Sequence, residues 1–70
     1  MAGNPKLHLR MAEDLLEKAR GLGGKDEARY LVLAAAHAGR AQVLARSTYD
    51  RDKASWVLER AIELVQEQLR

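Results

Sequence analysis

His8 and His37 are the residues in this 70-residue chain best suited to chemistry. Histidine can act as a general base, a metal ligand or a pH switch. His37 has no second ligand three or four residues further on, and two isolated histidines do not make a zinc site by their spacing. We therefore expect His37 to be a structural residue, hydrogen-bonded to a carboxylate of a neighbouring helix, with these possible partners: Glu13, Glu59 and Glu63.

Three hydroxyl side chains could in principle act as nucleophiles, but Ser47, Thr48 and Ser55 have no base nearby in the sequence. They are better explained as helix caps or surface positions. The segment "GLGG" lacks the preceding strand and the following Lys-Ser/Thr of a phosphate-binding loop. The chain has no cysteine, which excludes disulfides and sulfur-rich zinc modules. The sequence therefore predicts no enzymatic activity, with no catalytic residue, metal or cofactor.

Charge and hydropathy limit the kinds of partner and location. Twelve Lys and Arg against ten Asp and Glu give a formal charge of +2, well short of a nucleic-acid-binding tail or a polybasic membrane-binding run. The N-terminal residues contain no signal-peptide core, and the longest run without a strongly polar residue, Tyr30 to Ala36, is far below the ~20 residues that span a bilayer. We expect a cytoplasmic protein that does not bind membranes.

The elements that would position these residues are helices, because strand signals are absent. Asn4 followed by Pro5 is a helix start, since Asn caps free amides and Pro is tolerated at the first helical position. The glycines of "GLGG" end this helix. Asp26 and Glu27 then place acid at the start of a second helix, where the helix dipole favours it.

The third helix follows the segment "RSTYD". Either Ser47 with Asp50 three residues further on, or Thr48 alone, caps its start. Residues 1–70 should form one all-α domain, with helices at about residues 5–20, 26–46 and 49–69.

Apolar residues recur with helical spacing on one face of the first and third helices. In the first helix they are His8, Met11, Ala12, Leu15, Ala19 and Leu22, with Leu9 and Leu16 at the flank. In the third helix they are Ala54, Leu58, Ala61, Ile62, Val65 and Leu69, with Val57 and Leu64 at the edge. Short connections predict an antiparallel three-helix bundle. In the alternative, the first two helices form a hairpin and the third packs on a second chain.

The second helix carries two apolar stripes on nearly opposite sides. The alanine stripe consists of Ala34, Ala38, Ala41 and Ala45, flanked by the expected structural residues Tyr30 and His37 and by Leu33 and Leu44. The valine stripe consists of Val32, Ala36, Gly39 and Val43. Either both stripes contact the other two helices, or the valine stripe is a seam between molecules where small residues let backbones approach.

Self-association would offset a marginal core. A chain of this length buries only about 60% of its unfolded surface, and it contains no Phe. Trp56 lies far from the core face of the third helix, on the side of Tyr49, where it either covers the stem of Arg51 or Arg60 or anchors an interface. We expect a homodimer or higher oligomer, with these candidate interface residues: Val32, Ala36, Gly39, Val43, Tyr49 and Trp56.

Nucleic-acid binding is the alternative from another class. The second and third helices, joined by a short turn, resemble a helix-turn-helix in outline, with possible phosphate contacts from Arg46, Arg51, Lys53 and Arg60. Acidic residues interspersed with these cations leave little net charge on the face, which argues against this function.

The segments "AEDLLEKA" and "DEARYLVLAAAHAGRAQVLA" resemble small alanine-rich helical proteins of actinobacteria and their bacteriophages, mostly of unassigned function. The matching residues are Ala12, Glu13, Leu15, Leu16, Ala19, Asp26, Glu27, Ala28, Tyr30, Leu31, His37, Ala38, Ala41, Leu44 and Ala45. The resemblance covers about half of the chain and omits the third helix. It implies a bacteriophage-encoded protein, of a kind that includes proteins acting on a host protein.

The sequence as a whole predicts a non-enzymatic helical module that associates with itself and binds another protein. A small nucleic-acid-binding regulator, using the second and third helices, is the second hypothesis.

Overall fold

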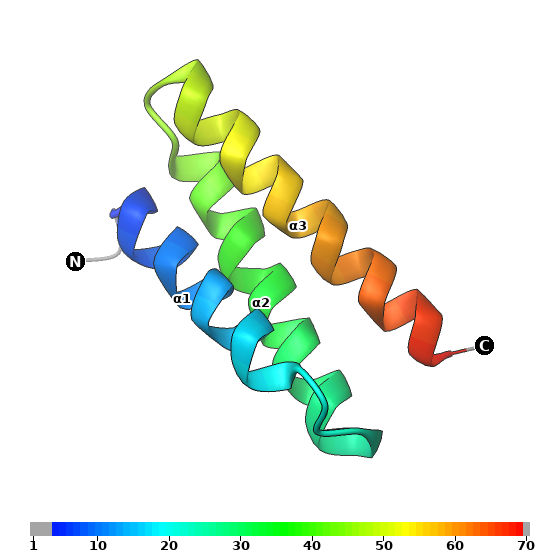
Figure 1. Cartoon of the computed structure of the whole chain (residues 1–70). Helices are drawn as coiled ribbons and strands as arrows, with labels where there is room; N and C mark the ends of the chain where they lie inside the picture. The colour runs from blue at the N-terminus through cyan, green and yellow to red at the C-terminus, as the bar shows by residue number, and fades with distance from the viewer. Residues whose placement is uncertain (1–3, 70) are drawn as a thin grey trace.

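The computed structural model describes residues 4–69, and all regular structure in this range is helical (Figure 1). The helices are α1 (Pro5–Ala19), α2 (Gly24–Leu44) and α3 (Thr48–Gln68). Each end lies within two residues of the position expected from the sequence. Consecutive helices run in opposite directions, and α3 packs on α2 of its own chain. The predicted three-helix arrangement is confirmed, and the alternative with α3 displaced onto a second chain is not what the chain adopts.

Asn4 begins α1 as predicted. Its side-chain Oδ1 accepts hydrogen bonds from the backbone amides of Lys6 and Leu7, at 3.1 and 3.2 Å. Pro5 occupies the first helical position, where no intrahelical partner for an N–H exists. Local sequence alone is enough to fix this helix end.

The start of α2 lies slightly before the predicted residue 26. Gly21 and Gly23 have φ angles of 74° and 73°, a backbone region that side-chain-bearing residues rarely adopt. The carboxylate of Glu27 accepts a hydrogen bond from the amide of Gly23 at 3.0 Å. The acidic first turn therefore acts partly through a direct hydrogen bond to the amide that precedes the helix.

Ser47 caps α3, and Thr48 is its first helical residue. The Ser47 hydroxyl accepts a hydrogen bond from the backbone amide of Asp50 at 3.1 Å. Of the two caps that the sequence allowed, the structure uses Ser47.

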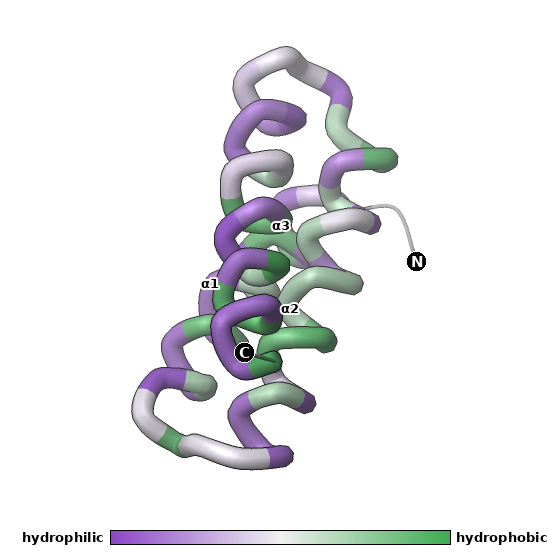
Figure 2. The backbone as a smooth tube through the Cα atoms, turned by 90° about the vertical axis from the view of Figure 1, so that its right-hand side faces the viewer, coloured by the Kyte–Doolittle hydropathy of each residue, from purple (hydrophilic) through white to green (hydrophobic). Residues whose placement is uncertain are grey.

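The three helices form an open arrangement in which α2 is central. Both α1 and α3 pack along α2 and touch each other at few points, and the molecule measures 35 × 21 × 14 Å along its principal axes. Figure 2 shows the middle of α2 as mostly apolar and its first turns as polar, whereas α1 and α3 mix apolar and polar residues along their length. The thin, open shape leaves one side of α2 and a groove between α1 and α3 uncovered.

The core is built mainly from alanine. Of the ten buried apolar residues in the described part of the chain, seven are alanine, and the larger three are Leu9, Leu31 and Val57. Small side chains let helix axes approach closely but bury little area each.

The core faces of α1 and α3 are turned slightly from those expected. Met11, Leu22, Ile62 and Leu69, all placed on the core face from the sequence, are exposed. The alanines expected there, Ala12 and Ala19 in α1 and Ala54 and Ala61 in α3, are buried as predicted. Leu9 and Val57, expected at the edges of these faces, are buried with them. Only small side chains fit where α1 and α3 contact α2 closely. A helical wheel does not distinguish small from large apolar residues, so it does not predict which of them lie at the contact.

Candidate functional site

The valine stripe faces away from both neighbouring helices. Val32 is 56% exposed and Val43 is 83% exposed, and Ala36 is exposed between them. The interpretation in which both stripes of α2 pack on α1 and α3 is therefore wrong. Gly39 lies on the same stripe. Apart from its chain neighbours and the backbone of its own helix, a Cβ added there would meet no heavy atom of the described residues within 4 Å. No contact within residues 4–69 accounts for a glycine in the middle of this helix, where it weakens helix stability.

Positive charge surrounds the valine stripe. Lys25, Arg29 and Arg40 are all exposed and line the two shallow depressions along this side of α2, whose linings contain no acidic residue. Within residues 4–69, none of these three cations takes part in an ion pair. The uncovered side of α2 is thus both apolar and cationic.

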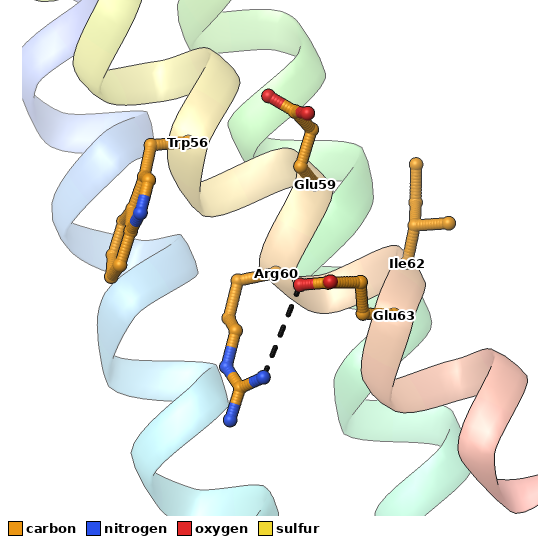
Figure 3. A pocket seen from close by; sticks show the side chains of 5 residues that line it. All are labelled: Trp56, Glu59, Arg60, Ile62 and Glu63. Carbon is orange, nitrogen blue, oxygen red and sulfur yellow. Dashed lines mark ion pairs between the residues drawn. The ribbon is translucent and has the colours of Figure 1, made fainter.

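Trp56 lies on the outer side of α3 and is 65% exposed. With Glu59, Arg60, Ile62 and Glu63 it lines a shallow depression (Figure 3), where the Arg60 guanidinium and the Glu63 carboxylate are 3.9 Å apart. Figure 3 shows Trp56 and Ile62 on opposite sides of this depression, with Arg60 and Glu63 between them. The exposed Trp56 indicates an interaction site, because Trp is enriched at binding hot spots.

The groove between α1 and α3 also reaches Trp56. Its walls here include Leu16 and Glu17 of α1 and Val57 and Leu64 of α3. Tyr49, the other aromatic interface candidate, lines the opposite end of the same groove and is exposed as well. The predicted interface residues therefore fall on two separate surfaces: the valine stripe of α2, and the Trp56 and Tyr49 side of α3.

His37 contacts His8 rather than a carboxylate. The two Nδ1 atoms are 3.1 Å apart, the ring planes are inclined by 23°, and the ring centroids are 5.3 Å apart. The distance between the ring centroids is close to the distance between the two Nδ1 atoms plus the radius of each ring. The two rings therefore meet edge to edge through their Nδ1 atoms, without overlapping faces. The predicted partners, Glu13, Glu59 and Glu63, are wrong, because α1 places His8 opposite His37.

The histidine pair has a simple chemical consequence. One Nδ1 donates and the other accepts, so the two rings hold complementary tautomers across the contact between α1 and α2. Both rings are half-buried. Within the described residues, no group of three or more His, Cys, Asp or Glu side chains could hold a metal ion. Tyr30, the other expected structural residue, is half-buried on α2.

A signal for the pair was present in the sequence. His8 lies eleven residues before the end of α1, and His37 lies thirteen residues after the start of α2. In an antiparallel hairpin, residues at similar distances from the turn become neighbours, because both helices rise by about 1.5 Å per residue.

Two polar contacts join α2 to α3. The Gln42 amide donates to the Ser55 hydroxyl at 2.6 Å, and the Gln68 amide donates to the Glu27 carboxylate. Sequence reasoning placed Ser55 on the surface and missed this contact, because the two partners of each bond are on different helices.

The connection between α2 and α3 does not produce a helix-turn-helix. The two helices lie side by side and antiparallel over their length (Figure 1), whereas a helix-turn-helix crosses at about 90–120°. Arg46 and Arg51 are exposed near this turn, and Lys53 and Arg60 follow along α3.

Comparison of the chain with protein-family models, with curated proteins and with solved structures finds no match. None of the three helices, as far as they are described, combines the length and apolar character needed to cross a membrane.

Proposed function

We propose that this protein is a non-enzymatic helical interaction module that associates with itself and binds a second protein. The observation that carries the proposal is the distribution of side-chain size. Alanine fills most of the buried positions, while large apolar side chains lie outside. The exposed set comprises Leu7, Met11, Leu22, Val32, Leu33, Val43, Tyr49, Trp56, Ile62 and Leu69.

This distribution is the reverse of the usual one in a small domain. Single exposed apolar residues need no explanation, but neighbouring ones on one face are typical of interaction sites. Val32 and Val43 lie on one side of α2, and Trp56 and Ile62 line one depression on α3. Association would also supply the buried area that an alanine core lacks.

The second protein is proposed to be a host component, as the resemblance to bacteriophage-encoded helical proteins implies. Its binding would use whichever apolar surface self-association leaves free.

Sedimentation velocity over a wide range of protein concentration tests the proposal. The wild type should shift toward faster-sedimenting species as concentration rises, and both Val43→Glu and Trp56→Ala should reduce the shift. Leu7→Glu is the matched control, because Leu7 is an exposed apolar residue on α1 that lines none of the depressions beside the valine stripe or Trp56. A wild-type protein that sediments as a monomer throughout, with both variants unchanged in partner binding, contradicts the proposal.

Partner capture extends the test. Host proteins retained by the immobilised wild type and by Leu7→Glu, but lost with both Val43→Glu and Trp56→Ala, would be specific partners. A titration with DNA at increasing salt separates the alternative class, since binding through phosphates weakens steeply as salt rises.

A further inference from the structure

The uncovered side of α2 and the outer side of α3 carry opposite charge. The basic face lies on α2 and consists of Lys25, Arg29, Val32, Ala36, Arg40 and Val43, all exposed. The acidic face lies on α3 and contains one cation, Arg60, which lines the same depression as Trp56. Its other residues are Asp52, Trp56, Glu59, Ile62, Glu63 and Glu67, also all exposed. The basic face therefore combines valine and alanine with positive charges, and the acidic face combines Trp56 and Ile62 with mainly negative charges.

A symmetric pairing of the basic face with itself is unfavourable. In a two-fold dimer both copies contribute the same surface. Every charged group of the basic face would then meet only Lys25, Arg29 or Arg40 of the other copy, and like charges brought together at an interface weaken binding. The valine stripe is thus poorly suited to contact a second valine stripe.

The acidic face of a second copy fits the basic face better. Arg60 and Glu63 already form a pair on α3, so the acids of the acidic face without an ion pair among the described residues are Asp52, Glu59 and Glu67. The basic face has three cations likewise without one. Lys25 to Arg40 and Asp52 to Glu67 each span fifteen residues, or about 22 Å along a helix. If the two helices run antiparallel, Lys25 of one copy lies near Glu67 of the other and Arg40 lies near Asp52, so opposite charges meet at both ends of the contact.

We propose that the protein assembles head to tail, with the basic face of one copy docked on the acidic face of the next. This inference rests on the proposed self-association and specifies its geometry. Trp56 is the anchor on one side. On the basic face of the other copy, the Trp56 ring packs over Gly39, where the chain leaves open space. Arg40 lies next to Gly39, and its guanidinium attracts an aromatic ring.

The size of the two faces sets the strength of this contact. A specific interface buries about 800 Å² on each partner, roughly a sixth of the 5152 Å² surface of this chain. One helix face per partner buries at most about 600 Å², which is the lower end of the areas buried in specific interfaces. The assembly is therefore weak. Because its contacts are partly between charges, it dissociates as salt rises. Because the contact is head to tail, each assembly has one free basic face at one end and one free acidic face at the other.

Mixing two variants tests the geometry. The first variant, Arg40→Gln with Val43→Gln, disables the basic face, and the second, Trp56→Ala with Glu59→Gln, disables the acidic face. Neutral replacements are chosen so that no new opposite charges pair. Each variant alone should associate at least about tenfold more weakly than the wild type, whereas an equimolar mixture should form a 1:1 complex that grows no further.

Other outcomes separate this geometry from the underlying function. If the wild type associates but the mixture of variants does not, the head-to-tail contact is wrong and self-association stands. If the second variant alone still dimerises, the contact is a symmetric one through α2. If the wild type is monomeric at every concentration, both the head-to-tail contact and the proposed self-association are wrong. Circular dichroism establishes that the variants are folded, and the single changes Arg40→Gln and Glu59→Gln repeat the mixing test if a double variant is not.

Discussion

Leu31 is the residue on which the stability of the isolated chain depends most clearly. It is 1% exposed, and it and Val57 are the largest fully buried side chains described. Leu33, two residues further along the same helix, is 43% exposed. The substitutions Leu31→Ala and Leu33→Ala remove the same atoms from the same helix, so that the difference between them isolates burial.

The structure gives both magnitudes. Replacing a buried leucine by alanine costs ~2–5 kcal/mol, from lost burial and the cavity that remains. A 70-residue domain has a free energy of unfolding of about 4–10 kcal/mol, at the usual contribution per residue. Leu31→Ala should therefore remove a fifth or more of the free energy of unfolding. Leu33→Ala should change the stability of the monomer by less than about 1 kcal/mol, because its side chain already contacts water.

Urea unfolding followed by circular dichroism measures both values, at low and high protein concentration. The loss caused by Leu31→Ala should not depend on concentration, because the side chain is covered within the chain. If Leu31→Ala does not fold, Leu31→Val should still cost about 1 kcal/mol, the typical loss for one buried methyl group. Equal losses for the two alanine variants at low concentration would refute this account of the core.

Three further changes test local features. Alanine at His8, at His37 and at both should give a coupling energy of about 0.5–1.5 kcal/mol in a double-mutant cycle of unfolding; additive effects would exclude the hydrogen bond. Ser47→Ala should destabilise by about 1 kcal/mol and Thr48→Ala by much less, measured by thermal unfolding, because Ser47 is the cap; the reverse order would assign the cap to Thr48. Gly39→Ala should raise the melting temperature of the dilute monomer, through a gain of roughly 0.5–1 kcal/mol, and weaken self-association in sedimentation; a stronger assembly would show that no partner approaches this glycine.

Helix ends were predictable because each depends on a few adjacent residues. Asn4 with Pro5 and Ser47 with Asp50 act through hydrogen bonds within three residues. The start of α2 was displaced by two residues because Glu27 reaches back to the amide of Gly23, which the acidic pattern alone did not specify.

Contacts between helices were harder to predict because they depend on rotation and axial position together. Ile62 was expected in the core and is exposed, whereas Leu31, on neither predicted stripe, is buried. A rotation of the helix by a fraction of a turn exchanges such neighbours without altering the apolar periodicity. The pair of His8 and His37 depends additionally on the axial position of α1 against α2, which the length of the glycine-rich turn sets.

The alanine core and the uncovered faces have one cause. Alanines at the contacts let α1 and α3 approach α2 closely, but this leaves little apolar area buried within the chain and places Val43 and Trp56 outside. A partner that covers these side chains binds only the folded state, so it must also raise the free energy of unfolding by mass action. Folding and association are therefore coupled, and the melting temperature should rise with protein concentration. A melting temperature independent of concentration, for a protein that does self-associate, would show that the associating surface is unconnected with the fold.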